Sequence, residues 1–293
     1  MSGIYFKCWG VRGSIPVPGP ATLRYGGNTS CFELYTDDGD HLIFDAGSGI
    51  RPLGSSIDFS KRKKFHILLS HTHWDHINGL PLSPLIFIPG NEITIYGPRT
   101  HELSLEEIIN GQMKYTYFPI RIAELKATFK FVELSDGKKF NIDNLSIEVS
   151  KINHPVECFG YKVGYKDKKF IYLGDNEPYY NMFGNDDAEV ENTIAEMNNK
   201  LSRFVRGADV LISDAQYTPE EYRTKIGWGH SSTHHAINLA LKSGVKNLFF
   251  NHHDPTRTDD ELDQIVSHYR KLVKEKELDI KVGATIEGLE ISD

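Results

Sequence analysis

The stretch that decides the fold of this protein runs from Phe65 to His76 and reads Phe-His-Ile-Leu-Leu-Ser-His-Thr-His-Trp-Asp-His. Its first half, Phe65–Ser70, is an apolar run typical of a buried strand. Its second half, His71–His76, contains three imidazoles and one carboxylate. These are ligands that zinc and the neighbouring transition metals prefer. The stretch therefore predicts a site for two divalent metal ions in a loop at the end of a strand.

Three further residues of ligand type occur much later in the chain. His154, Asp175 and His252 each follow an apolar run, so three more strands would each deliver one ligand at an end. A single histidine or aspartate in such a place is more often an ordinary polar residue. Together with His71–His76, their order and placement favour one shared site.

Length and charge restrict the possible functions. The 293 residues suit one large α/β domain or two small ones, and because no Pro/Ser-rich linker divides the chain we expect a single domain over 1–293. The net charge is −7, from 33 Lys and Arg against 40 Asp and Glu. This balance argues against charge-driven binding of long nucleic acid but leaves room for a small phosphorylated substrate.

The cysteines and the N-terminus indicate the compartment. Cys8, Cys31 and Cys158 are odd in number and widely spaced, which is not a disulfide framework. The first ten residues lack the pattern of a signal peptide, and no apolar run approaches the roughly 20 residues of a membrane span. We expect a cytoplasmic protein without membrane contact.

The hydrophobic patterning predicts two strand-rich blocks with interleaved helices. We expect strands at Ile4–Trp9, Cys31–Tyr35, His41–Phe44, Phe65–Leu69, Glu92–Tyr96, Thr128–Leu134, Leu145–Ile152, Gly160–Tyr165, Lys169–Leu173, Asp209–Ile212, Asn247–Phe250 and Thr285–Ile291. We expect helices at Asp187–Arg206, Ser231–Ser243 and Asp259–Glu275. Such a pattern favours two sheets packed face to face with helices outside. The irregular segment Asn176–Glu191 is predicted to be a loop near the site, a self-association surface or a solvated surface loop.

The motif order His-x-His-x-Asp-His, a distant His, Gly-Asp after a strand and a late His resembles the metallo-β-lactamase superfamily over nearly the whole chain. The resemblance implies an α/β fold, the αββα sandwich of two mixed sheets, with two metal ions at one edge. Zinc is the expected ion, with manganese as the alternative. The implied ligands are His71, His73 and His154 for one ion, Asp75, His76 and His252 for the other, and Asp175 as the bridge. His253 is a rival to His252, and only one of these neighbours should enter the site.

Other residues are expected to assist. Asp214 ends a strand and His230 precedes a helix, and this pair resembles the acid–His couple of the phosphodiesterase branches, in which the histidine protonates the leaving oxygen. The role of a loop histidine without part in catalysis stays open for His230. Asp45 resembles a carboxylate that orients a ligand histidine.

Three residues in glycine-bearing turns or at a helix start are candidates for substrate contact. Arg12 and Asn28 lie in turns that could approach a phosphate, although tight turns between strands explain their glycines equally well. Ser231 lies beside His230, and Ser231 or Ser232 is a natural helix cap.

The motif with Asp75 beside His76 resembles the phosphodiesterase and nuclease branches rather than the lactamases. We expect hydrolysis of a small phosphodiester, above all a 3′,5′-cyclic nucleotide, as in the phage anti-Pycsar enzymes. A tRNA 3′-processing endonuclease is the main alternative, although no long basic insertion is present. A lactone- or thioester-cleaving hydrolase and a metal-binding sensor stay open. Relatives often form homodimers, so a homodimer is an expectation by analogy.

Overall fold

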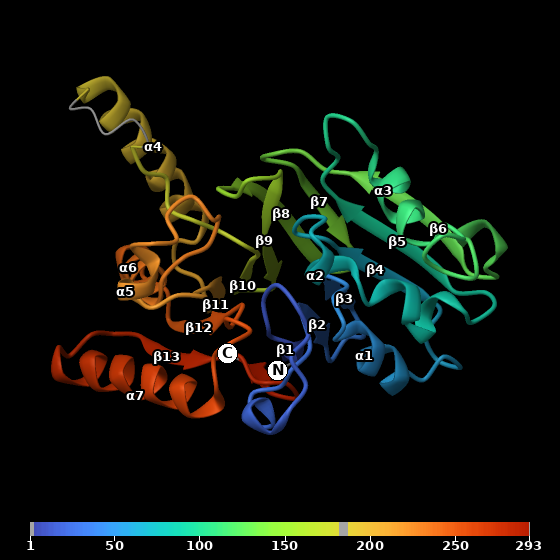
Figure 1. Cartoon of the computed structure of the whole chain (residues 1–293), viewed down its shortest axis with the longest axis horizontal. Helices are drawn as coiled ribbons and strands as arrows, with labels where there is room; N and C mark the ends of the chain where they lie inside the picture. Colours follow the sequence, from blue (N-terminus) through green and yellow to red (C-terminus); the bar gives the residue numbers. More distant parts are fainter. Residues whose placement is uncertain (1–2, 182–186, 293) are drawn as a thin grey trace.

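The computed structural model describes residues 3–181 and 187–292 and consists of two seven-stranded sheets. The first sheet has the order β14-β1-β2-β3-β4-β5-β6, and the second has the order β13-β12-β11-β10-β9-β8-β7. Figure 1 shows the two sheets facing each other, with α1 and α3 beside the first and α4, α6 and α7 beside the second. This is the αββα sandwich that was expected.

Both sheets are mixed. The strands of the first sheet are β1 Ile4–Gly10, β2 Cys31–Thr36, β3 His41–Phe44, β4 Lys64–Leu68, β5 Glu92–Gly97, β6 Thr128–Glu133 and β14 Glu290–Ser292. Strands β3 to β6 are parallel to one another, whereas β14, β1, β2 and β3 pair in antiparallel fashion. The strands of the second sheet are β7 Lys139–Ile142, β8 Leu145–Ile152, β9 Cys158–Tyr165, β10 Lys168–Leu173, β11 Val210–Asp214, β12 Asn247–Asn251 and β13 Lys281–Ala284. Here β7 to β10 are antiparallel and β10 to β13 are parallel.

Apolar clusters fill the three interfaces between these layers. The central cluster lies between the sheets and includes the aromatic residues Phe6, Phe32, Phe44 and Tyr172, whose rings contact one another. A second cluster lies between the second sheet and the helices α4 Ala188–Phe204, α6 Thr233–Lys242 and α7 Asp259–Glu275. A third lies on the outer face of the first sheet, under α1 Ile50–Ser56, α2 Trp74–Ile77 and α3 Leu105–Gln112. Strands β3 and β4 contribute apolar side chains to both adjoining clusters, because successive residues of a strand point to opposite faces of the sheet.

The three helices predicted from the sequence are present, and each has a side-chain cap. Asp187 caps α4, Ser232 caps α6 and Thr258 caps α7 by accepting backbone N–H groups of the first turn. The helices α1, α2 and α3 and the short helix α5, Pro219–Tyr222, were not anticipated. In the part of the chain that the structure describes, no helix is both long enough and apolar enough to cross a membrane.

The segments 285–291 and 176–191 can be compared with what the sequence predicts for them. The strand predicted at Thr285–Ile291 is wrong, because the chain turns there between β13 of one sheet and β14 of the other, with Gly288 at φ 83°. In the irregular segment 176–191, residues 182–186 lie outside the described residues, while residues 176–181 have no helix or strand. Cys8, Cys31 and Cys158 are free and buried, as expected of small apolar residues.

Candidate metal centre

Loops at one end of the two sheets bring the predicted ligand residues together. The motif His71–His76 follows β4, His154 follows β8, Asp175 follows β10, and His252 follows β12. Within this set, two groups have ligand atoms that all lie within 4.8 Å of one another. The first group is His71, His73, His154 and Asp175, and the second is Asp75, His76, Asp175 and His252. Asp175 belongs to both groups, as a bridging carboxylate would.

The second group has the spacing that a tetrahedral metal site requires. The Nε2 atoms of His76 and His252 are 3.4 Å apart, and each lies 3.1–3.4 Å from Oδ2 of Asp75 and Oδ1 of Asp175. Four ligands at metal distances of about 2.0–2.2 Å in a tetrahedron would lie roughly 3.3–3.6 Å from one another. The side chains therefore converge on a point that suits a zinc-sized ion.

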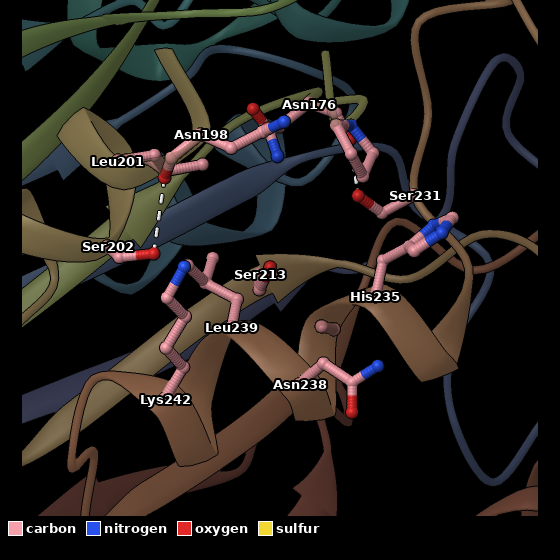
Figure 2. Close-up of a pocket in the computed structure, with 12 residues that line it drawn as sticks. Asn176, Asn198, Leu201, Ser202, Ser213, Ser231, His235, Asn238, Leu239 and Lys242 are labelled. Atoms are coloured by element: carbon pink, nitrogen blue, oxygen red, sulfur yellow. Dashed lines mark hydrogen bonds between the residues drawn. The ribbon is translucent and has the colours of Figure 1, made fainter. Parts of the chain in front are cut away.

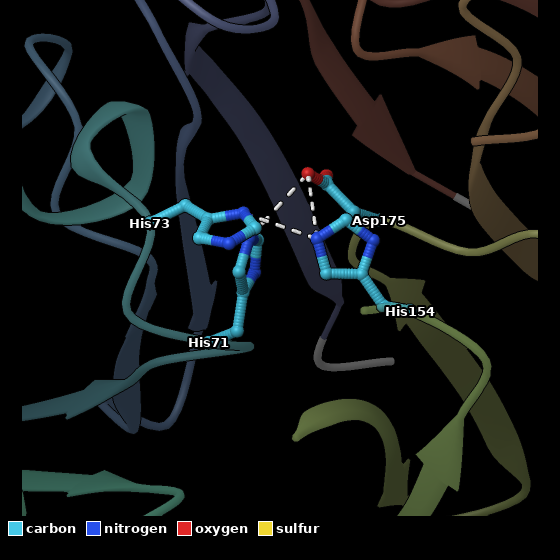
Figure 3. Close-up of side chains that lie close together, drawn as sticks. All are labelled: His71, His73, His154 and Asp175. Atoms are coloured by element: carbon cyan, nitrogen blue, oxygen red, sulfur yellow. Dashed lines mark hydrogen bonds and ion pairs between the residues drawn. The ribbon is translucent and has the colours of Figure 1, made fainter. Parts of the chain in front are cut away.

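The first group converges in the same way from two sides. Figure 3 shows the imidazoles of His71 and His73 facing His154 and Asp175. Nδ1 of His73 lies 3.1 Å from Nε2 of His154, and Nε2 of His71 lies 3.5 Å from Oδ2 of Asp175. Nε2 of His71 and Oδ1 of Asp175 are buried and have no hydrogen-bond partner among the described residues. Because buried polar atoms are rarely left unpaired, these atoms are placed as metal ligands would be.

Electrostatics also favour cations at this position. Burial raises the pKa of Asp175, but the imidazoles around it, His252 foremost, lower it well below its ordinary value. Burial lowers the pKa of His154 to about 4, which keeps that imidazole neutral near pH 7. Burial lowers the pKa of His76, but the charges of Asp175, Asp75 and Asp45 outweigh it and raise this pKa well above its ordinary value. A bound cation would displace that proton, because neutral imidazoles and ionised carboxylates are the protonation states in which these side chains bind metals. The cluster is therefore suited to two divalent ions.

Buried hydrogen bonds orient the imidazoles from behind. Nδ1 of His76 donates to Asp45 at 2.7 Å, Nδ1 of His154 donates to the carbonyl of Gly229 at 2.9 Å, and Nδ1 of His252 lies 3.1 Å from Oε1 of Gln216. In each case the Nε2 atom is left to face the cluster. Asp45 thus lies where the sequence predicted a carboxylate behind a ligand histidine. Gln216 was missed, because a single glutamine two residues after Asp214 carries no pattern.

His252 reaches the cluster and its neighbour His253 does not. His252 has φ 59°, and the ring of His253 turns away, with its Nε2 donating to the carbonyl of Thr285 at 2.9 Å. Gly13 packs against the ring of His252, and a Cβ atom on residue 13 would lie only 2.3 Å from that ring. The glycine-bearing turn near the N-terminus therefore shapes the site through its backbone. The next residue, Ser14, donates its N–H to Asp75 at 2.7 Å.

The pair of Asp214 and His230 forms beside the two groups. Nδ1 of His230 donates to Oδ2 of Asp214 at 2.9 Å, and the His230 ring stacks on that of His252 with a centroid distance of 4.8 Å. The side chain of Asp214 is fully buried, whereas that of His230 is 12% exposed. Burial lowers the pKa of His230, but the charges of Asp214 and Asp175 outweigh it and raise the pKa to about 9. The His230 ring therefore borders the cluster and is partly open to solvent.

The three residues predicted to contact substrate each form hydrogen bonds with other parts of the protein. Arg12 is fully buried, and its guanidinium donates to the carbonyls of Gly26 and Arg257. Asn28 is engaged by Glu287, which accepts both its backbone and its side-chain N–H groups. Buried backbone carbonyls need hydrogen-bond donors, and Arg12 supplies them to two such carbonyls. Both side chains therefore stabilise the N-terminal turns.

Ser231 is also turned away from the cluster. Its hydroxyl donates to the carbonyl of Asn176 at 2.6 Å, and it lines a cavity of about 190 Å³ between α4 and α6. Figure 2 shows this cavity, with Asn198 and Leu201 on one side and Leu239 and Lys242 on the other. Asn176 and Ser231 line it and directly follow Asp175 and His230, so the cavity borders the two loops that carry these side chains.

Glu177 is a buried carboxylate that the sequence did not single out. It accepts the hydroxyl of Tyr222 at 2.7 Å and the backbone N–H groups of Gly227 and Gly229 at 2.8 and 2.9 Å. The carbonyl of Gly229 in turn accepts Nδ1 of His154, and His230 is the next residue. One carboxylate thus holds the turn that positions two histidines of the site. Its place two residues after Asp175 is the only sequence signal that could have suggested it.

Comparisons with known proteins agree with this geometry. The family model described as "Beta-lactamase superfamily domain" matches residues 42–253. Ribonuclease Z of Bacillus thuringiensis (strain Al Hakam) is 24% identical over 280 residues, covering 84% of this chain and 89% of the relative. The metallo-beta-lactamase fold protein YhfI from Bacillus subtilis superposes with a TM-score of 0.70 at 18% identity over 100% of both chains. Unliganded yeast PDE1 gives a TM-score of 0.70 at 16% identity over 99% of both chains.

Proposed function

Because this chain belongs to the β-lactamase superfamily and has the metallo-β-lactamase fold, we propose that it is a two-metal phosphodiesterase whose substrate is a small diester, a 3′,5′-cyclic nucleotide above all. The observation that carries the proposal is the pairing of His230 with Asp214 next to two ligand groups that share Asp175. A departing ribose oxygen is a basic alkoxide that needs a proton, whereas the thiolate that leaves a thioester does not.

Under this proposal, His71, His73 and His154 would hold one ion, Asp75, His76 and His252 would hold the other, and Asp175 would contribute to both groups. Two divalent ions held there would supply Lewis-acid chemistry toward a phosphoryl group and would lower the pKa of bound water. The imidazole-rich ligand set favours zinc, with manganese as the alternative.

The chain's own residues then have separate tasks. Asp45, Gln216 and the carbonyl of Gly229 keep the ligand imidazoles in one tautomer and one orientation. His230 holds a proton that Asp214 stabilises, and it delivers this proton to the leaving oxygen. Asp214 orients His230 and does not itself react with the substrate, because it is buried and its two oxygens also accept the N–H groups of Asn176 and Gln216.

A tRNA 3′-processing endonuclease is the second candidate. It is favoured by the relatives named Ribonuclease Z, which match over most of this chain. Against it stand the net charge of −7 and the lack of a long basic insertion in the sequence. Both candidates use the same cluster and the same proton donor, so they differ in what lies outside the cluster.

The test is hydrolysis by the zinc-loaded protein of purine and pyrimidine cyclic nucleotides, bis(p-nitrophenyl) phosphate and an unprocessed tRNA. We expect ring opening of at least one cyclic nucleotide. Specific trimming of the tRNA alone would move the assignment to the nuclease, and no turnover with both ions bound would refute phosphodiester hydrolysis.

Two variants assign the roles. His230→Asn should keep both ions by elemental analysis yet lower kcat by about 10²–10⁴-fold, the usual contribution of a proton donor. His234→Asn is the matched control, because His234 is exposed on α6 only four residues further along. Loss of metal from the His230 variant would show that this residue is not the proton donor.

A further inference from the structure

A separate cavity of about 300 Å³ opens beside the candidate metal centre. Three loops line it, namely residues 153–155 with the ligand His154, the segment with Tyr179 and Tyr180, and the turn with Gly227 and Gly229. Its volume lies at the lower end of the range for small-molecule pockets. Because His154 and Gly229 form part of its wall, a group in this cavity is directly next to the cluster and to His230.

The wall of the cavity offers planar and neutral groups. Tyr179 and Tyr180 contribute two aromatic side chains, and Asn153 contributes a side-chain amide. The carboxylate of Glu177 also lines the cavity, but three donors already occupy it. A phosphate therefore finds no cationic partner among these lining residues, whereas a flat heterocycle finds aromatic surface and a hydrogen-bonding amide.

The segment with the two tyrosines is held in place on both sides. The side chain of Asn198 on α4 accepts the N–H of Tyr179 at 3.0 Å and donates to its carbonyl at 2.9 Å. The hydroxyl of Tyr180 comes so close to Gly227 that a Cβ atom there would lie 3.0 Å from it. The cavity is thus preformed, and ligand binding does not have to order it.

Trp228 is an exposed aromatic residue in the turn between the two cavity glycines. It is 57% exposed, and the ammonium group of Lys225 lies 3.8 Å from the centroid of its ring. The positive charge of Lys225 near this turn suits a ligand that also carries phosphate.

We propose that this cavity is the nucleobase subsite of the enzyme, in which the base attached to the scissile phosphodiester lies against Tyr180. The inference rests on the proposed function and extends it, because it makes the substrate a nucleotide rather than any diester. The base can come from a mononucleotide or from the end of an RNA strand, since both present the same aromatic ring.

Direct binding tests the subsite without turnover. Calorimetry on the zinc-loaded full chain compares adenosine and cytidine 5′-monophosphates with ribose 5-phosphate, which lacks the base. We expect at least one nucleotide to bind about 5- to 150-fold more tightly than ribose 5-phosphate, which is the usual value of one stacked base. Tyr180→Leu keeps apolar volume without the planar ring and should abolish most of this advantage, while Tyr180→Phe should retain it.

The control is Tyr35→Ala, which removes a tyrosine from β2 in a cavity that shares no residue with this one. Equal affinities in the wild-type protein, or an advantage that survives Tyr180→Leu, would refute the subsite even if diesters are hydrolysed. A nucleotide advantage that depends on Tyr180, without hydrolysis of any diester, would support the subsite and refute the proposed function. Binding of a trinucleotide, measured in parallel, separates the two sources of the base. If only the trinucleotide loses affinity in Tyr180→Leu, the base belongs to the end of an RNA strand.

Discussion

Glu177 offers the sharpest test of how this site is held together. The substitution Glu177→Gln preserves size but replaces one carboxylate oxygen by an NH₂ group. The amide oxygen can still accept from Tyr222 and Gly227, which share Oε1 of the carboxylate. The NH₂ group then faces the N–H of Gly229 at the position of an acceptor 2.9 Å away. The variant therefore has one buried N–H group without an acceptor.

The magnitude follows from that single lost acceptor. A buried donor left without a partner costs about 1–3 kcal/mol in the free energy of unfolding. In a domain of this size, that corresponds to a fall in Tm of roughly 2–4 °C for each kcal/mol. The larger effect should be on turnover, because a shift of the turn by about 1 Å displaces His230 and can lower kcat by about 10²-fold.

The assay is steady-state hydrolysis of bis(p-nitrophenyl) phosphate, with metal content and Tm measured on the same samples. We expect kcat to fall with little change in KM when the assay is run well below the Tm measured for the variant, where unfolding removes no active protein. Glu221→Gln is the matched control, because Glu221 also accepts several donors, among them Arg257 at 2.6 and 2.9 Å, but does not hold the turn at 227–229. A kcat equal to that of the control would refute the positioning role of Glu177.

Four further outcomes are expected. Gly229→Ala places a Cβ 2.4 Å from Nδ1 of His154 at φ 86°, so the unfolding free energy should fall by about 1–3 kcal/mol in chemical denaturation, and metal affinity should fall with it. Asp45→Ala removes the acceptor of His76, and competition with a chromogenic chelator should show a 10- to 100-fold weaker metal affinity, roughly the usual effect of such a change. Phe44→Ala in the central cluster should cost about 3–5 kcal/mol in urea unfolding with no direct effect on bound metal. Removal of metal by a chelator should lower Tm, since zinc at 100 times its Kd stabilises the fold by about 2.7 kcal/mol; an unchanged Tm would contradict a metal site in the folded state.

Local patterning predicted most of the secondary structure and most of the cluster. The apolar run before His71 and the capped helices at 187–206, 231–243 and 259–275 are visible because strand and helix periodicities are properties of consecutive residues. The metal ligands are visible for a related reason. Each stands directly after an apolar run, and the ends of such strands meet at one edge of the sandwich.

Packing between distant segments decided the rest. Arg12 and Asn28 lie in turns that resemble a phosphate site, yet each has a partner more than 240 positions away, the carbonyl of Arg257 for Arg12 and the carboxylate of Glu287 for Asn28. Residues 285–289 of the strand predicted at 285–291 form no strand, because the chain crosses there from β13 of one sheet to β14 of the other, and no local pattern records that crossing.

The sequence alone therefore determined the fold family and the metal-ligand candidates, since both depend on short motifs and their order. Only the tertiary structure decided that His252 rather than His253 enters the cluster, and that Glu177 holds the turn before His230. The physical reason is that a hydrogen bond or a ligand contact depends on where loops far apart in the sequence come to lie, and that is set by how the two sheets pack.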